Sequence, residues 1–450
     1  MKVFSRQNNL LAYGLYLLVF LLPLQTRWMI KLGNINGGYW EYGTMSLYAA
    51  DILIMAMLLD YFIRKEIRHL ESNDLNRKKV MVWLLIGGLE LIIFISIFFA
   101  VDLGLAVYGY ARFLLAIGFF FLVTQVKHDK IRLYYAVIFS GLIQSIFALQ
   151  QYITQSVYAN KWLGMAAQSA GDLGVSVTEV GDERWLRAYG TLPHPNMLGG
   201  FLAVALLINI LLYLKLFYKL EKSEDDEESK RYRWQILLVL FIFTISFVGL
   251  LLTYSRGAWL AFLVGLIFLA PTVVNKYRWV GFFNLAKFFI IITVVGALFA
   301  YAQWGQVQSR FGMNNERLEK VSVFERLVYA QDAETLIKNN LFFGVGIGNY
   351  GRAVYDRVDE QRSAYYYQPV HNVFLLVIAE IGVFGLGFFT ALILYLLRLA
   401  YQRRGFGKIA ILFAVITIMF FDHWLWSLAF GGYLFWLIMG ISLNKEDLTT

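Results

Sequence analysis

The sequence predicts an all-α integral membrane protein with about twelve transmembrane helices and a long loop outside the membrane that contains short helices. Two observations support this fold class. Of the 450 residues, 59% are hydrophobic and only 16% are charged, and the apolar residues form runs of about 18 or more, long enough to span a bilayer as helices. A membrane β-barrel would need short alternating strands, which these unbroken runs do not offer. Residues 1–450 are therefore interpreted as one polytopic membrane domain.

The predicted spans follow the apolar runs in order. The first run lacks a small-residue cleavage site and is followed by further spans, so we interpret it as a retained helix rather than a signal peptide. The absence of cysteine excludes disulfides, thiol nucleophiles and thiolate metal sites. The predicted spans are 10–30, 44–63, 80–100, 105–126, 131–153, 196–214, 234–253, 257–274, 280–302, 371–397, 408–422 and 424–443.

The distribution of charge predicts the orientation. The net charge is +9, and most lysines and arginines fall in alternate loops, whereas the short loops 100–104 and 420–427 have none. This is the positive-inside pattern, which places both termini in the cytoplasm. The positive charge is thereby explained by topology, so we expect membrane lipid and not nucleic acid as a partner. The basic segments are 64–79, 126–132, 275–278, 397–408 and the charged cytoplasmic loop 215–233.

Two longer polar segments then fall on the extracytoplasmic side, at 154–195 and at 303–370. In the second segment, "VSVFERLVYAQDAETLIKNN" (Val321 to Asn340) has the apolar spacing of an amphipathic helix. The glycines of the following "LFFGVGIGNYG" lack the strand that a dinucleotide fingerprint requires. They favour a turn that brings the backbone close to another segment.

Arginines on the extracytoplasmic side break the charge rule and need an explanation. Each one alone is either a snorkelling side chain, a partner in an ion pair or a ligand-binding group. Several together favour an anion at the outer leaflet, because the planar guanidinium binds phosphate oxygens in pairs. A phosphorylated lipid would suit such a cluster. The arginines concerned are Arg112, Arg184, Arg187, Arg256 and Arg326.

Three histidines share that side. His194 lies between two prolines, where it can shape the turn, and His423 lies beside Asp422, where it can cap the last loop. His371 opens a span after the long loop, and it is either a satisfied interfacial histidine or a proton acceptor. Glu380 lies too deep in the same helix to act on the same group, which favours a helix–helix hydrogen bond.

Four stretches carry a resemblance to a known family. "RAYGTLPHPNMLGGFLA", "TYSRGAWLAFLVG", "ERLVYAQDAETLIKNNLFFGVGIGNY" and "HNVFLLVIAEIGVFGLG" occur in this order over residues 180–400. Together they resemble the bacterial O-antigen ligase and polymerase superfamily, which are polytopic glycosyltransferases. The resemblance implies a GT-C-like fold in the bacterial inner membrane. It also implies transfer of a glycan from an undecaprenyl-diphosphate carrier to a glycan, lipid or protein acceptor at the extracytoplasmic face.

The resemblance also implies roles for particular residues. His371 would accept the proton of the acceptor hydroxyl, and Arg187 and Arg326 would hold the diphosphate, with inversion at the anomeric carbon. Arg184 competes with Arg187 for its position, and Arg256 occupies the "SRG" position. The predicted supporting residues are Asn372, His194, Asn196 and Arg112.

No metal or other cofactor is predicted, because "GDER" and "DRVDE" lack convincing ligand spacing. Within the family, the residues leave ligase, repeat-unit polymerase and protein O-glycosyltransferase open, together with the sugar. From another class, twelve spans with a charged central loop would also suit a transporter or flippase, although the sequence shows no internal repeat.

Overall fold

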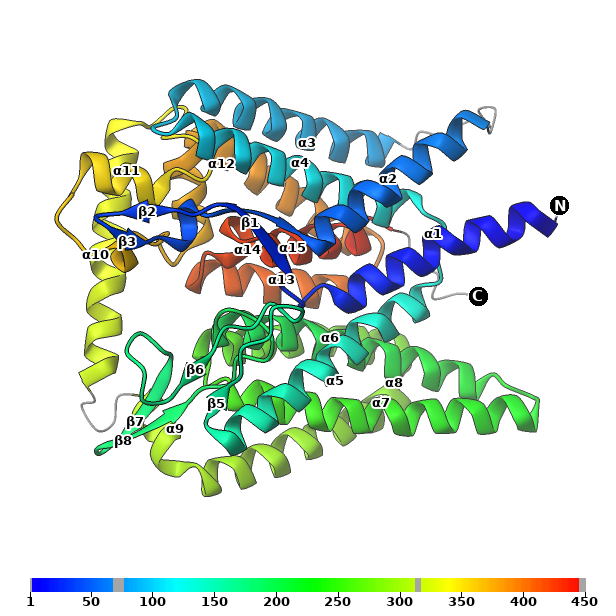
Figure 1. The fold of residues 1–450 in the computed structure, drawn as a ribbon. Coiled ribbons are helices and arrows are strands. Elements are labelled where there is room, and N and C mark those ends of the chain that lie inside the picture. The colour runs from blue at the N-terminus through cyan, green and yellow to red at the C-terminus, as the bar shows by residue number, and fades with distance from the viewer. Residues whose placement is uncertain (1, 68–76, 312–316, 445–450) are drawn as a thin grey trace.

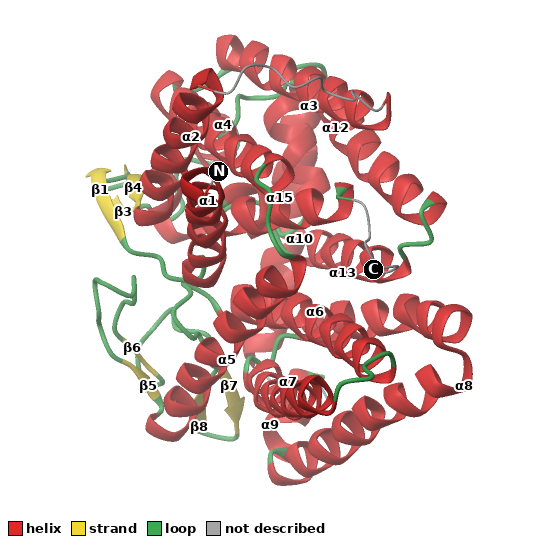
Figure 2. Ribbon diagram, turned by 90° about the vertical axis from the view of Figure 1, so that its right-hand side faces the viewer, coloured by secondary structure: helices red, strands yellow, loops and turns green. Residues whose placement is uncertain are grey.

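The computed structural model describes residues 2–67, 77–311 and 317–444 (Figure 1). Most of the basic segment 64–79 lies outside these residues. Helices make up most of the molecule, and the strands lie beside the helix bundle (Figure 2). The α-helices are α1 (Lys2–Leu21), α2 (Ala49–Ile67), α3 (Arg77–Ser96), α4 (Leu103–Gln125), α5 (Lys130–Thr154), α6 (Pro195–Glu221), α7 (Asp226–Leu252), α8 (Arg256–Ala302), α9 (Trp304–Arg310), α10 (Arg317–Asn339), α11 (Tyr350–Arg357), α12 (Val373–Gln402), α13 (Phe406–Phe421), α14 (Trp424–Ser427) and α15 (Ala429–Leu443).

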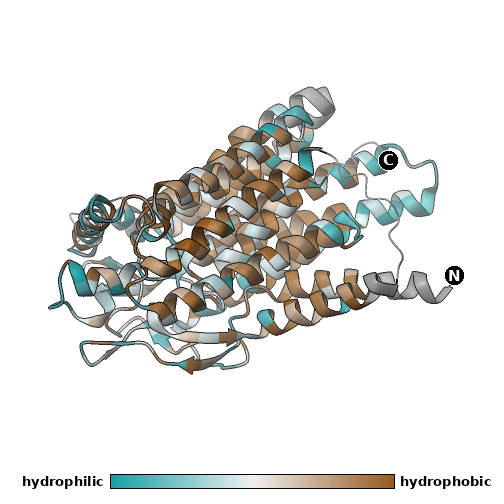
Figure 3. Cartoon of the chain, turned by 90° about the horizontal axis from the view of Figure 1, so that it is seen from above, coloured by the Kyte–Doolittle hydropathy of each residue, from teal (hydrophilic) through white to brown (hydrophobic). Residues whose placement is uncertain are grey.

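The helices are those of a multi-pass membrane protein. Among the described residues, seven helices are long and apolar enough to cross a membrane. Four shorter apolar helices accompany them, at Leu10–Leu21, Arg256–Pro271, Phe406–Phe421 and Ala429–Leu443. Apolar residues fill the middle of the helices and polar residues gather at their two ends (Figure 3). The helical membrane class is confirmed, while the number twelve and the GT-C-like arrangement stay predictions.

Helix α8 accounts for two of the predicted spans. A straight helix of its 47 residues would be about 70 Å long. However, the rings of Tyr254, just before α8, and Phe299, near its end, lie 5.5 Å apart. The helix therefore doubles back on itself, and its arms correspond to the predicted spans 257–274 and 280–302.

The prediction was wrong where the first two spans face each other. Helix α1 ends at Leu21, two residues before Pro23, and α2 begins only at Ala49. The ends of the predicted spans 10–30 and 44–63 instead form strands β1 (Arg27–Lys31) and β4 (Met45–Tyr48), which pair antiparallel. The chain is thus not purely helical.

The strands form four two-stranded antiparallel pairs within the described residues. Between β1 and β4, the hairpin β2–β3 turns at Asn36–Gly37, where both residues have positive φ angles of 50° and 73°. An Asn-Gly pair suits such a two-residue turn, because both residues tolerate left-handed backbone. The remaining strands are β2 (Asn34–Ile35), β3 (Gly38–Tyr39), β5 (Ser156–Val157), β6 (Gln168–Ser169), β7 (Val177–Val180) and β8 (Glu183–Leu186).

Two further boundaries differ from the prediction. Most of the charged segment 215–233 is helical, because α6 continues to Glu221 and α7 begins at Asp226. Asp225 caps α7 by accepting a hydrogen bond from the Glu227 N–H, and acidic residues in the first turn favour a helix N-terminus. The predicted span 424–443 is broken into the short α14 and α15.

All strands and α9 to α11 gather at one end of the bundle, here called the loop end, and helix α1 begins at the other (Figure 1). Helix α10 confirms the helix expected in 303–370. The face expected to be apolar is different, because Phe324 and Leu327 are exposed and the buried face carries Tyr329, Ala333 and Leu336. Helix α6 runs through the centre and is almost wholly buried. At its start, a Cβ on Gly200 would lie 2.5 Å from the Trp424 ring, so only glycine allows this close packing.

The glycine-rich segment after α10 breaks helix α12. At Gly382, with φ of 71°, an added Cβ would lie 2.0 Å from the Phe342 carbonyl oxygen. The N–H groups of Val345 and Gly346 donate to the carbonyls of Ala379 and Glu380, which the kink leaves unpaired. The prediction of a turn in close backbone contact is confirmed.

The expected helix–helix hydrogen bond of Glu380 is also confirmed. The Trp426 Nε1 of α14 donates to Glu380 Oε2 on α12 over 2.8 Å. This bond ties the break in α12 to the start of the last helix pair, beside the loop end of the bundle.

Candidate functional site

A basic cavity of about 280 Å³ opens at the loop end, and we call it the arginine cavity. Three arginines from three elements line it: Arg256 begins α8, Arg310 ends α9 and Arg326 lies on α10. The Arg256 guanidinium donates to the Arg310 carbonyl oxygen over 2.7 Å, which joins the start of α8 to the end of α9. The Arg326 side chain makes no hydrogen bond or ion pair with the residues that the structure describes.

Arg187 does not line the arginine cavity but contacts Asn196, which does. Its side chain is buried, with Nε donating to the Thr253 carbonyl oxygen and Nη2 donating to Asn196 Oδ1, both over 2.8 Å. Burial and the charges of Arg310 and the other cavity arginines lower the pKa of Arg187 well below its ordinary value. Because arginine remains protonated in proteins, this lowering means that the surroundings of Arg187 disfavour its positive charge.

A second cavity of about 370 Å³ adjoins the first, and we call it the histidine cavity. His371, His194 and His423 line it, whereas none of the three arginines of the arginine cavity does. Asp422 lines both cavities, as does Trp424. The carboxylate is therefore at the boundary between a basic compartment and one that holds imidazoles.

Ring contacts hold the His371 side chain, and no hydrogen bond joins it to the residues that the structure describes. Its ring stacks on Tyr329 of α10 with centroids 5.8 Å apart, and it meets the His423 ring edge-on at 5.2 Å. Its Nδ1 is buried without a hydrogen-bond partner among the described residues. An imidazole with an unpaired nitrogen, fixed in orientation, is suited to take up a proton.

The protonation states follow from burial and neighbouring charge. Burial lowers the pKa of His371, and it lowers those of His194 and His423 further, so the imidazoles are neutral at pH 7. Asp422 acts in the opposite direction and raises the pKa of His371. Although burial disfavours its own charge, the nearby histidines and the Asn196 amide hold the pKa of Asp422 below its ordinary value. The site thus pairs a neutral base with an ionised carboxylate.

The same residues raise the question of a metal ion. One ligand atom each from His371, Asp422 and His423 lies within 4.8 Å of the others. Yet His423 Nδ1 already contacts the Ser427 hydroxyl at 2.7 Å, and the adjoining arginines oppose a divalent cation. The donor set is incomplete for a structural zinc site, which needs four ligands.

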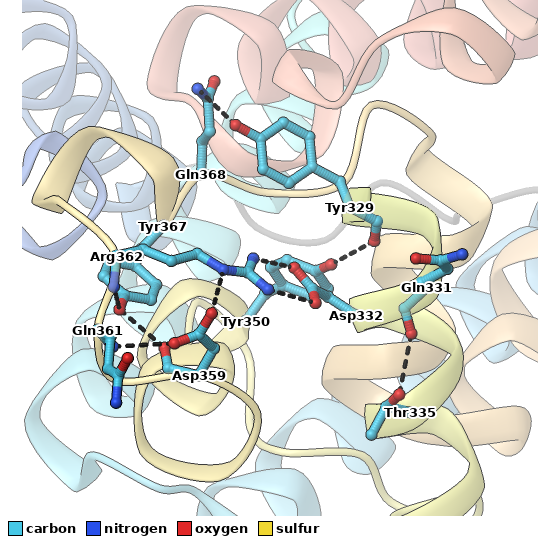
Figure 4. Close-up of polar contacts among 10 residues, drawn as sticks. All are labelled: Tyr329, Gln331, Asp332, Thr335, Tyr350, Asp359, Gln361, Arg362, Tyr367 and Gln368. Atoms are coloured by element: carbon cyan, nitrogen blue, oxygen red, sulfur yellow. Dashed lines mark hydrogen bonds and ion pairs between the residues drawn. The ribbon is translucent and has the colours of Figure 1, made fainter. Parts of the chain in front are cut away.

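An ion-pair network fixes α10 relative to the segment that leads to His371 (Figure 4). Arg362 makes a two-bond contact with Asp332 of α10, at 2.5 and 3.0 Å, and its Nε donates to Asp359 over 2.9 Å. The Gln368 amide donates to the Tyr329 hydroxyl over 3.2 Å. Since Tyr329 stacks on His371, this network positions the imidazole.

The other sequence-predicted residues have varied environments. Asn196 lines the arginine cavity, whereas Asn372 and His194 cap α12 and α6 by accepting backbone N–H groups. Arg184 lies 3.9 Å from Glu179 across the β7–β8 hairpin. Arg112 pairs with the buried Asp51 inside the bundle. The structure therefore brings neither of these two arginines into the arginine cavity.

Sequence reasoning missed Arg310, Asp422 and His423 as members of the site. Asp422 and His423 follow α13, about 50 residues after His371, and only the packing of α13 and α14 against α12 brings them together. The available signal was an acidic residue and a histidine side by side on the predicted outer side. Arg310 could have been found as another arginine on that side.

The fold and the site define a polytopic membrane protein whose loop end holds a cavity lined by three arginines beside a cavity lined by three histidines. Residues 238–390 match a family model described as O-Antigen ligase. The match includes Arg256, Arg310, Arg326 and His371, and it confirms the resemblance to the O-antigen ligase superfamily. It also supports a membrane function of the O-antigen ligase or polymerase type. A search of curated proteins found no match for this chain.

Proposed function

We propose that the protein is an inverting, metal-independent glycosyltransferase of the bacterial inner membrane. It moves a glycan from an undecaprenyl-diphosphate carrier to an acceptor hydroxyl at the extracytoplasmic face, which is the loop end. The observation that carries this proposal is the boundary at Asp422, where a cavity with three arginines meets the unpaired imidazole of His371.

The chemistry is a direct displacement. His371 takes the proton of the acceptor hydroxyl as its oxygen bonds to the anomeric carbon, while the bond from that carbon to the diphosphate breaks. The diphosphate leaves with the electron pair and is stabilised by Arg256, Arg310 and Arg326. The Asp422 carboxylate stabilises the imidazolium that forms, as an oriented carboxylate does in other base catalysts. Both substrates are held in position, which lowers the entropic part of the barrier.

The test uses cells that carry either the wild-type protein or His371→Ala. The lipid-linked glycans are extracted and their masses compared, with membrane insertion checked by immunoblot. Accumulated single repeat units with the variant indicate a polymerase, and accumulated long chains or one finished glycan indicate a ligase. An unchanged distribution refutes a glycosyltransferase role and favours the transporter.

A further inference from the structure

We propose that the histidine cavity is the binding site for a sugar of the acceptor, and that the ion pair of Arg27 with Glu41 recognises hydroxyl groups of that sugar. This inference rests on the proposed function and assigns one of its substrates to a set of residues.

The first argument is the direction of the reaction. In a direct displacement, the attacking oxygen and the leaving diphosphate lie on opposite sides of the anomeric carbon. Of these two cavities, His371 lines the histidine cavity, while Arg256, Arg310 and Arg326 line the arginine cavity. The anomeric carbon therefore lies near Asp422, which both cavities share, and the acceptor approaches from the histidine cavity.

The second argument is the charge of the lining. Arg27 is neutralised by Glu41 through bonds of 2.5 and 3.0 Å, so it adds no net positive charge. A diphosphate in this cavity would meet the carboxylates of Glu41 and Asp422. A neutral polyhydroxy ligand would not be repelled by them.

The third argument is the shape and chemistry of the groups. The guanidinium and the carboxylate are about a quarter and two-fifths exposed, which leaves donors and acceptors available at fixed positions. Tyr42, Tyr189 and Trp424 add aromatic rings to the same lining. A rigid donor–acceptor pair beside aromatic rings suits adjacent hydroxyls on a sugar ring, and about 370 Å³ is within the range of small-molecule pockets.

The position in the chain agrees with a specificity site. Arg27 and Glu41 belong to the β1–β4 segment, which lies outside the residues that match the family model. Of the residues that line the histidine cavity, only Gln368 and His371 fall within 238–390. The residues that match the family model thus supply His371, and residues outside the match supply most of the lining of the histidine cavity.

The experiment separates acceptor from donor. Purified full-length protein is placed in nanodiscs. Cells that lack the protein supply the lipid-linked glycan, which serves as the donor. The envelope glycolipid of the same cells is titrated as the acceptor. Arg27→Gln and Glu41→Gln should each raise the acceptor concentration for half-maximal transfer by roughly tenfold or more. The donor concentration for half-maximal transfer and the binding of undecaprenyl diphosphate should not change.

Two further variants guard against misfolding. The charge exchange Arg27→Glu with Glu41→Arg keeps the ion pair but reverses the positions of the hydrogen-bond donors and acceptors. It should therefore also raise the acceptor concentration for half-maximal transfer. Arg352→Gln, which breaks an ion pair with Asp356 on α11 outside both cavities, should leave acceptor use unchanged.

A higher donor concentration for half-maximal transfer, or weaker binding of undecaprenyl diphosphate, would assign the histidine cavity to the donor and overturn the inference. Unchanged kinetics in all Arg27 and Glu41 variants would show that the cavity takes no substrate. Absence of transfer by the wild-type protein would refute the proposed function itself, and the inference would fall with it.

Discussion

Replacing Arg326 by lysine tests whether this residue acts through its geometry or only through its charge. In the described part of the chain, its guanidinium has no protein partner, so its donors remain available to a ligand. Lysine keeps the charge but loses the fork that binds two phosphate oxygens at once. One lost charge-assisted hydrogen bond costs about 1.5–3 kcal/mol, which corresponds to a roughly 10- to 150-fold loss of kcat/KM.

The same reasoning gives Arg187→Lys a different outcome. That change removes donors from the Thr253 carbonyl and the Asn196 amide oxygen, and each buried acceptor left unpaired costs about 1–3 kcal/mol. Thermal unfolding should therefore show a lower Tm for Arg187→Lys but a wild-type Tm for Arg326→Lys, while transfer falls in both. Arg352→Lys, on the exposed face of α11, serves as the control. A wild-type rate for Arg326→Lys would show that the charge alone is sufficient, and a lower Tm would contradict the absence of polar contacts to the described part of the chain.

Four further predictions concern the base, its support and the absence of a metal requirement. Because burial places the pKa of His371 below its ordinary 6.5, kcat/KM should rise with pH through a midpoint below 6.5 and stay level above it. Asp422→Asn removes the charge that raises the pKa of His371, so the midpoint should move to lower pH. An unmoved midpoint would show that Asp422 does not affect the titration of His371. Incubation with EDTA should leave transfer unchanged, whereas a loss that zinc restores would assign the cluster with His423 to a metal. Asp332→Asn removes one of the two carboxylates that pair with Arg362 and leaves Asp359, so it should cost about 1–3 kcal/mol in the free energy of unfolding, measured by denaturant titration.

The helices were predictable because lipid exposure demands long apolar runs, which a sequence shows directly. The β1–β4 segment was missed because span prediction weighs hydropathy, and "RWMIKL" is apolar enough to extend a helix. The decisive local signal was Asn36–Gly37, an Asn-Gly turn flanked by short extended runs. Pro23 marks the end of the first helix for the same reason that proline ends helices elsewhere.

The candidate site divides in the same way. His371 and Arg187 were noticeable as single residues, since a charge or imidazole beside a span is unusual on sequence alone. Their grouping was not, because it depends on how separate helices pack. Asp422 illustrates the point: its neighbours along the chain are apolar or aromatic except for His423, and its role follows only from contact with segments far away in the sequence.

Asn196 explains how the two compartments coexist. Its Oδ1 accepts from Arg187 over 2.8 Å, and its Nδ2 donates to Asp422 over 2.9 Å. A direct ion pair between Arg187 and Asp422 would cancel both charges, leaving weaker anion binding on one side and no stabilisation of the His371 imidazolium on the other. The neutral amide satisfies a hydrogen bond of each group without neutralising either. Its place at the first turn of α6, after Pro195, fixes its backbone and adds the positive end of a helix dipole beside the arginine cavity. The polar "HPN" sequence therefore links Arg187 to Asp422 through a neutral amide, without a direct ion pair between them.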